Sequence, residues 1–189
     1  MKTQYKIAMS GLPGAGKDGL IKRLSEYYQI PKLSIGTLRR EFAVNELGMT
    51  IDEMNERRLN DKTLDTQFDE FQARYMKENE KWIIEGRLPY YFAPPEAIKL
   101  FLAVDKHEAA KRIFSADRES EKNYKNEKEV LETLEQRMKS DKDAYWDLYK
   151  TNCYDVTNFD IILDTTYRTQ EEVFRKAIQR ITLLSLSKY

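Results

Sequence analysis

Residues 11–18 of the chain read GLPGAGKD, with the glycine and lysine spacing G-x-x-x-x-G-K. Glycines at this spacing let a loop curl so that successive backbone N–H groups point inward, where they bind phosphate oxygens. A helix that begins directly after the loop adds partial positive charge from its N-terminus. The ammonium group of Lys17 can then reach the outer phosphates, so the segment predicts a site for a di- or triphosphate. The alternative is an ordinary glycine-rich turn followed by a lysine.

Asp18 stands where such a loop usually has serine or threonine, whose hydroxyl binds Mg²⁺. A carboxylate can also bind Mg²⁺, directly or through water, but it brings negative charge close to the phosphates. In the alternative interpretation, Asp18 only stabilises the first turn of the helix. The residues that we expect to bind the phosphates or the metal are Gly11, Leu12, Pro13, Gly14, Ala15, Gly16, Lys17, Asp18 and Gly19.

Two further positions carry arginines that suit a second phosphate. Arg39 and Arg40 lie one helical turn after Gly36, and Arg87 ends the triplet EGR directly after an apolar run. The planar guanidinium fork binds phosphate oxygens in pairs, and ligands of parallel sheets bind beyond the carboxyl ends of the strands. The alternative for Arg39 and Arg40 is that they are solvated arginines on a helix. Glu85, in the same triplet as Arg87, could orient an arginine clamp or a metal-bound water, or it could simply cap a helix or form an ion pair.

The elements that must position these residues alternate along the chain. Apolar runs predict strands at 5–9, 32–35, 82–86, 98–104 and 159–164, with helices between them that include one short and one longer helix within 50–79. The strands are continuously apolar, which is typical of a parallel sheet covered by helices on both faces. The residues Thr169 to Glu172 form a capping-box pattern that begins a C-terminal helix. We therefore predict an α/β fold in a single domain, 1–189.

Four blocks carry a resemblance to a known family. They read GLPGAGK, LSIGTLRREFA, WIIEGRLPYY and EQRMKSDKDAYWDLYK…YDVTNFDIILDTT. In this order and spacing they resemble the cytidylate kinase-like branch of the nucleoside monophosphate kinases, especially its short archaeal-type enzymes, over nearly the whole chain. The resemblance implies a three-layer P-loop kinase fold with a five-stranded parallel sheet and a helical lid. It places an acceptor-binding helical segment at about 36–80 and the lid at about 112–145.

The same resemblance implies transfer of the γ-phosphate of ATP, with Mg²⁺, to a nucleoside monophosphate, CMP or dCMP. Thr165 would lie near the adenine edge and Asp18 near the metal. By position, the implied catalytic residues are Lys17, Arg40, Arg87, Arg112, Arg118 and Arg137, and the implied acceptor-binding residues are Gly36, Arg40, Gly86, Arg87 and Asp141. Arg118 and its neighbours within 117–128 fit a solvated face equally well. Thr37 replaces an acidic residue of the family, which leaves base or ribose selection open. Lys142 replaces a common arginine, so the capacity for bidentate binding is lost there.

Other functions stay open at this point. The departures at 18, 19, 37 and 142 also fit a degenerate nucleotide-binding protein that acts as a sensor or scaffold, and another small acceptor fits the same architecture. A nucleic-acid enzyme usually has a basic excess, whereas 32 Lys and Arg here balance 32 Asp and Glu. Cys153 is the only cysteine, which excludes an intramolecular disulfide and a multi-cysteine zinc site. We expect a cytoplasmic monomer that binds small nucleotides and neither nucleic acid nor membrane.

Overall fold

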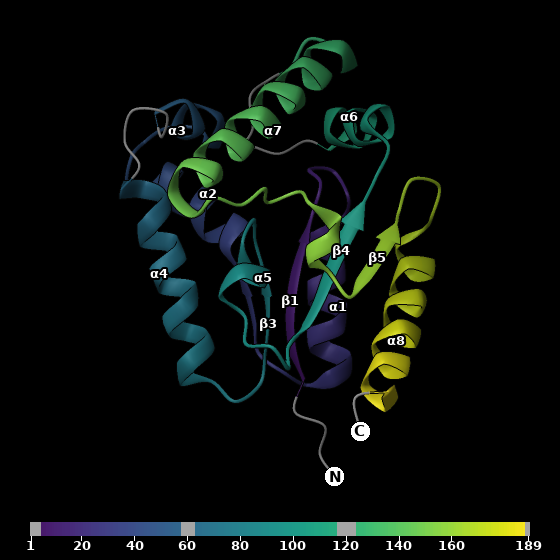
Figure 1. The fold of residues 1–189 in the computed structure, drawn as a ribbon. Coiled ribbons are helices and arrows are strands. Elements are labelled where there is room, and N and C mark those ends of the chain that lie inside the picture. Colours follow the sequence, from purple (N-terminus) through teal and green to yellow (C-terminus); the bar gives the residue numbers. More distant parts are fainter. Residues whose placement is uncertain (1–4, 58–62, 117–123, 188–189) are drawn as a thin grey trace.

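The computed structural model describes residues 5–57, 63–116 and 124–187 and shows a five-stranded sheet at the centre of the molecule (Figure 1). All strand pairs are parallel, and the order is β2-β3-β1-β4-β5. The strands are β1 (Lys6–Gly11), β2 (Lys32–Ser34), β3 (Trp82–Glu85), β4 (Ile98–Ala103) and β5 (Ile161–Asp164). Each of the five predicted strands is therefore present.

Helices connect the strands in the expected alternation. They are α1 (Lys17–Tyr28), α2 (Ile35–Asn45), α3 (Ile51–Arg57), α4 (Thr63–Glu78), α5 (Pro89–Phe92), α6 (Lys106–Ser115), α7 (Glu127–Tyr149), the 3₁₀ turn η1 (Val156–Asn158) and α8 (Gln170–Ser187). The predicted capping box is formed, because Thr169 N–H donates to Glu172 Oε2 at 2.8 Å and Glu172 N–H donates to Thr169 Oγ1 at 3.2 Å. In the described ranges, no helix combines the length and the apolar composition of a membrane span.

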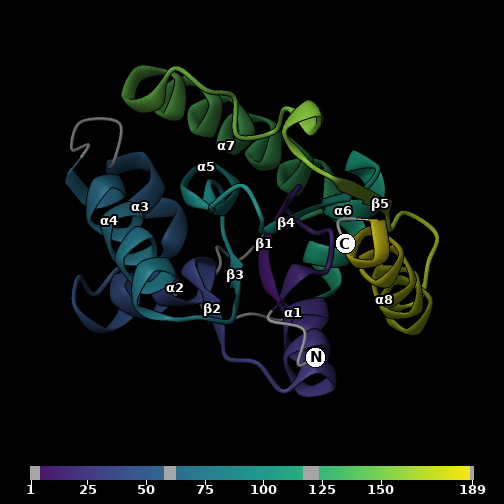
Figure 2. The ribbon, with the colours of Figure 1, turned by 60° about the horizontal axis from the view of Figure 1, so that its bottom comes forward.

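Both faces of the sheet are buried, as continuous apolar strands require. Along β1, Ile7 and Met9 pack toward one face and Ala8 toward the other, and all three are fully buried. Helices α1 and α8 cover the first face, while α5 and the end of α7 lie over the second (Figure 2). The arrangement confirms the predicted sheet with helices on both faces.

The topology decides where a ligand can bind. Strand β1 pairs with β3 on one side and with β4 on the other, so the connections diverge at its carboxyl end. Helices α6 and α7 extend over this end of the sheet, at the top of Figure 1. They occupy much of the predicted lid at 112–145, and residues 117–123 of that lid lie outside the described part of the chain.

Candidate active site

The loop between β1 and α1 has the backbone that the glycine spacing predicts. Gly16, the N-cap of α1, has a φ of 83°, and Gly14 has a φ of 75°. Side chains other than glycine rarely adopt these angles. A Cβ at Gly14 would also lie 2.9 Å from the Cα of Ala109 in α6. Glycine at this position therefore allows the loop to pass close to α6.

The Lys17 side chain folds back into this loop. Its Nζ donates hydrogen bonds to the backbone oxygens of Gly11, at 3.0 Å, and Leu12, at 2.9 Å. The residue is half-buried. Removal of the ammonium from solvent lowers the pKa of Lys17 to about 8. The lysine is thus held inside the phosphate-binding loop, where it stays mostly charged at neutral pH.

Four other charged groups lie close enough to change the pKa of Lys17. After burial, the largest effect comes from Glu85, which raises this pKa, and Asp18 raises it less. Arg87 and Arg137 lower it by repulsion between like charges. Such effects weaken with distance, so these charged groups lie in the same region of the molecule as Lys17. Two predicted catalytic arginines, Arg87 and Arg137, are thus within electrostatic range of the lysine.

Arg87 is held by a buried carboxylate. Its Nε donates to Asp141 Oδ2 at 2.8 Å, and Tyr154 Oη donates to the same oxygen at 2.6 Å. Asp141 is fully buried. Burial by itself lowers the pKa of Arg87, but the charge of Asp141, its hydrogen bond and the neighbouring Tyr154 and Tyr145 together outweigh burial and hold this pKa well above its usual value. Since the bond uses Nε, the terminal nitrogens of the fork remain as donors for a phosphate.

The structure shows the Asp141 carboxylate anchoring Arg87. The contact with the acceptor nucleotide that the resemblance implied for Asp141 stays a prediction. Burial, followed by the Asp141 charge, also raises the pKa of Tyr154 far above its ordinary value. The phenol therefore stays protonated and donates to Asp141. Sequence reasoning did not select Tyr154, because no local pattern links it to a carboxylate 13 positions earlier.

Arg40 brings together two positions where the chain departs from the family pattern. Its Nη2 lies 3.3 Å from Asp18 Oδ2 and donates to Thr37 Oγ1 at 3.1 Å. The carboxylate beside Arg40 thus comes from α1. A Cβ at Gly36 would lie 3.6 Å from Arg40 Nη1 and 3.5 Å from Glu85 Oε2. The side chains of Arg40 and Glu85 therefore lie close to the backbone of Gly36 at the start of α2.

Glu85 joins this space to the end of β3. It is 3% exposed, and Ser34 Oγ donates to its Oε2 at 2.7 Å. The same Ser34 oxygen caps α2 by accepting from Thr37 N–H at 3.1 Å. Glu85 therefore accepts a hydrogen bond from Ser34, and its negative charge also raises the pKa of Lys17.

The predicted adenine-binding loop is held by Arg112. Its Nη2 donates to the backbone oxygens of Thr165, at 2.7 Å, and Thr166, at 2.6 Å. Its Nε also pairs with Glu108 at 3.1 Å. In the structure this arginine fixes the loop after β5, while the charge of Arg137 acts on the pKa of Lys17. Arg118 lies outside the described residues.

The possible metal ligands around the loop fit a magnesium ion that is bound together with a nucleotide. Mg²⁺ is usually held by one or two carboxylates, with water and phosphate oxygens completing its shell. The side chain of Asp18 is 45% exposed in the first turn of α1, next to Lys17. Within the described residues, no group of three or more acidic, histidine or cysteine side chains forms a metal cage. The arrangement therefore fits a metal that arrives with phosphates.

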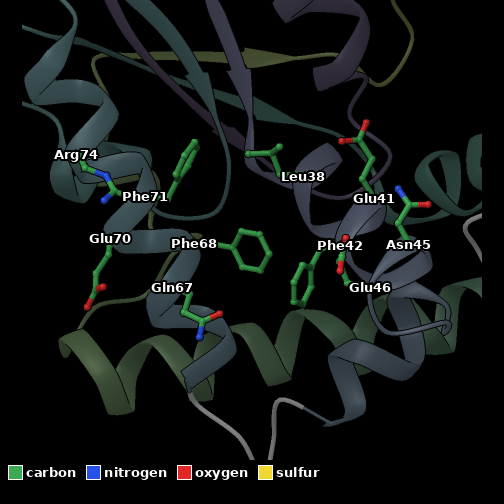
Figure 3. A pocket seen from close by; sticks show the side chains of 10 residues that line it. All are labelled: Leu38, Glu41, Phe42, Asn45, Glu46, Gln67, Phe68, Glu70, Phe71 and Arg74. Carbon is green, nitrogen blue, oxygen red and sulfur yellow. The ribbon is translucent and has the colours of Figure 1, made fainter.

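A groove of about 780 Å³ lies between α2 and α4. Figure 3 shows Phe42 of α2 and Phe68 of α4 facing each other across it, and their rings meet edge to face at 5.7 Å. Phe68 also contacts the guanidinium of Arg39, whose Cζ lies 5.3 Å from the ring centre. Arg39 is 6% exposed. The sequence grouped Arg39 with Arg40, either as an arginine suited to a second phosphate or as a solvated side chain, and the structure shows that Arg39 is buried.

Comparisons with known proteins also indicate a kinase family. Residues 6–167 match the cytidylate kinase-like family. The chain is 27% identical to a cytidylate kinase of Pyrobaculum neutrophilum over 97% of this chain and 96% of that protein. It is 31% identical to an S-adenosylmethionine-dependent nucleotide dehydratase of Lacinutrix mariniflava over 92% of this chain. The match spans 34%, about a third, of the length of that relative.

A solved structure supports the fold. The shikimate kinase from Acinetobacter baumannii in complex with shikimate superposes with a TM-score of 0.64 over 98% of this chain and 97% of that chain. The two sequences are 15% identical, so the likeness concerns the P-loop kinase fold alone. The family match covers most of the chain and includes the phosphate-binding loop, Arg40 and Arg87. The chain therefore belongs to the cytidylate kinase-like family.

Proposed function

We propose that the protein is a nucleoside monophosphate kinase that transfers the γ-phosphate of ATP to CMP or dCMP. The observation that carries the proposal is Lys17 held by hydrogen bonds within the phosphate-binding loop, with Arg87 and Arg137 close enough to lower its pKa by charge repulsion. Three cations in one region, from α1, the turn after β3 and α7, suit two polyanions that face each other. The names of the relatives favour a nucleotide over shikimate or a sugar as acceptor.

In this scheme the residues act mainly by position and charge. The loop and Lys17 hold the β- and γ-phosphates of ATP, while Arg40 and Arg87 hold the acceptor phosphate in line. An oxygen of the acceptor phosphate forms a bond to the γ-phosphorus as the bond to the bridging β–γ oxygen breaks, and ADP leaves. The acceptor is already an anion, so no general base is needed. Asp18 is the side chain that would hold Mg²⁺, which when bound would neutralise phosphate charge.

A panel of nucleoside monophosphates with ATP and Mg²⁺ tests the proposal. ADP formation should be fastest with CMP or dCMP, and it should be lost in Lys17→Met while the thermal melting temperature stays close to that of the wild type. Shikimate and gluconate serve as acceptors that share only the fold. No ADP formation above the hydrolytic background with any nucleotide would refute the kinase assignment.

A second candidate function is a nucleotide-binding sensor. The observation that favours it is Asp18, whose carboxylate stands in the magnesium position and pairs with Arg40. A sensor should show nucleotide-dependent thermal stabilisation without turnover in the same panel.

A further inference from the structure

A buried polar pair lies on the inner side of α4. Asp69 is 3% exposed and Gln72 is 1% exposed. The amide nitrogen Nε2 of Gln72 donates to Asp69 Oδ1 at 2.7 Å, and Tyr149 Oη donates to Asp69 Oδ2 at 3.1 Å. The pair therefore joins α4 to the end of α7. Gln72 follows Phe68 by four positions, so it occupies an apolar position of the helical pattern.

The amide oxygen of Gln72 is buried and has no hydrogen-bond partner among the described residues. A buried acceptor without a donor is unfavourable and uncommon in folded proteins. A polar side chain at an apolar position, with one of its two groups satisfied and the other left open, points to a ligand that supplies the missing donor.

The elements around this pair are those that frame the acceptor phosphate. Helix α2 carries Arg40 and, next to it, the buried Arg39, whose guanidinium lies over Phe68 of α4. Helix α7 carries Asp141, which holds Arg87, and Tyr149, which binds Asp69. Eight residues of helix separate these two α7 positions by about 12 Å. A nucleotide spans a comparable distance from its phosphate to the far edge of its base.

Asp69 fixes the orientation of the Gln72 amide. If the amide turned over, Oε1 would face the Asp69 carboxylate, and two acceptors would repel each other. Oε1 therefore remains an acceptor directed away from Asp69. Cytosine presents an amino group, N4–H₂, at the position where uracil and thymine present the acceptor O4. An oxygen that is fixed as an acceptor accepts a hydrogen bond from the cytosine amino group and repels the O4 oxygen of uracil or thymine.

We propose that Asp69 and Gln72 select the acceptor base by requiring an exocyclic amino group, so that cytosine is accepted and uracil is rejected. Gln72 Oε1 accepts from the amino group, and Arg39 supplies donors for the acceptors of the same ring edge. Asp69 acts through Gln72 as a positioning residue. The inference rests on the proposed function, since it assigns the base subsite of the same acceptor site.

The test is the ratio of kcat/KM for CMP to that for UMP, with the ratio of their dissociation constants from calorimetry. The wild type should prefer CMP in both. In Asp69→Asn the neutral side chain can donate or accept, so Gln72 can turn either way, and both ratios should fall roughly tenfold. Gln72→Met, which has no polar group, should lower them similarly. Lys77→Ala, at an exposed position of α4 outside this network, should leave both ratios unchanged.

The outcomes separate this inference from the kinase assignment. Selective binding of CMP without phosphate transfer would overturn the proposed function and support the base selection. Transfer with no preference for CMP in the wild type would overturn the base selection alone. The same holds if Asp69→Asn and Gln72→Met, both folded by circular dichroism, retain the wild-type ratios. If Asp69→Asn does not fold, Gln72→Met decides.

Discussion

The pKa of Lys17 predicts how nucleotide affinity depends on pH. In the free protein, burial lowers this pKa to about 8, although Glu85 and Asp18 oppose the shift. A bound triphosphate adds negative charge next to the ammonium and raises its pKa again. Above pH 8 the free protein must therefore take up a proton in order to bind ATP. Affinity should be nearly constant below pH 7 and should fall as the pH rises through 8.

The size of the effect follows from the protonated fraction of Lys17. With a pKa of about 8, roughly nine-tenths of the free protein carries the charge at pH 7 and roughly one-tenth at pH 9. If only the protonated form binds, the dissociation constant for ATP should rise about tenfold, which corresponds to about 1.4 kcal/mol.

Isothermal titration calorimetry at pH 7, 8 and 9, in two buffers with different ionisation enthalpies, measures both the affinity and the proton uptake. Lys17→Arg is the matched control, because a guanidinium stays charged over this range and should give a flat profile. A wild-type dissociation constant that is equally flat from pH 7 to 9, without proton uptake, would refute the placement of the ammonium.

Two further predictions concern the arginines of the acceptor site. Asp18→Ser removes the carboxylate that pairs with Arg40 at 3.3 Å; because the pair is partly exposed, affinity for CMP without ATP or Mg²⁺ should increase about two- to fivefold by calorimetry, and an unchanged or weaker affinity would contradict this. Arg87→Ala leaves the fully buried Asp141 without its ion-pair partner, so the free energy of unfolding in urea should decrease by about 3–5 kcal/mol. Adding Asp141→Asn should recover part of that loss, and a double variant no more stable than Arg87→Ala would argue against a charge effect.

Local patterns were sufficient for the fold and for the phosphate-binding loop. The five apolar runs gave the five strands because a strand buried on both faces needs continuous apolar side chains. The spacing of Gly14, Gly16 and Lys17 predicted a strand-to-helix turn that needs left-handed backbone angles, and these angles are observed. Buried strands and the loop turn both depend on the types of neighbouring residues, so the sequence alone was enough to predict them.

Contacts between distant residues could not be predicted in this way. Asp18 and Arg40 are 22 positions apart, and Tyr149 is 80 positions from Asp69. Their meeting depends on how α1, α2, α4 and α7 pack, which no local period records. A signal did exist for Gln72, a polar residue at an apolar helical position, but such a residue is more often exposed than buried. Only the packing shows which case applies.

The protein should hold two phosphate groups face to face, one on the loop with Lys17 and one on Arg40 and Arg87. A bisubstrate analogue in which adenosine and cytidine are joined by five phosphates engages both places at once, and calorimetry measures its dissociation constant. We expect it to bind at least about a hundredfold more tightly than ATP, with most of this gain lost in Arg40→Ala. An analogue that binds no more tightly than ATP would show that the two phosphate groups do not face each other.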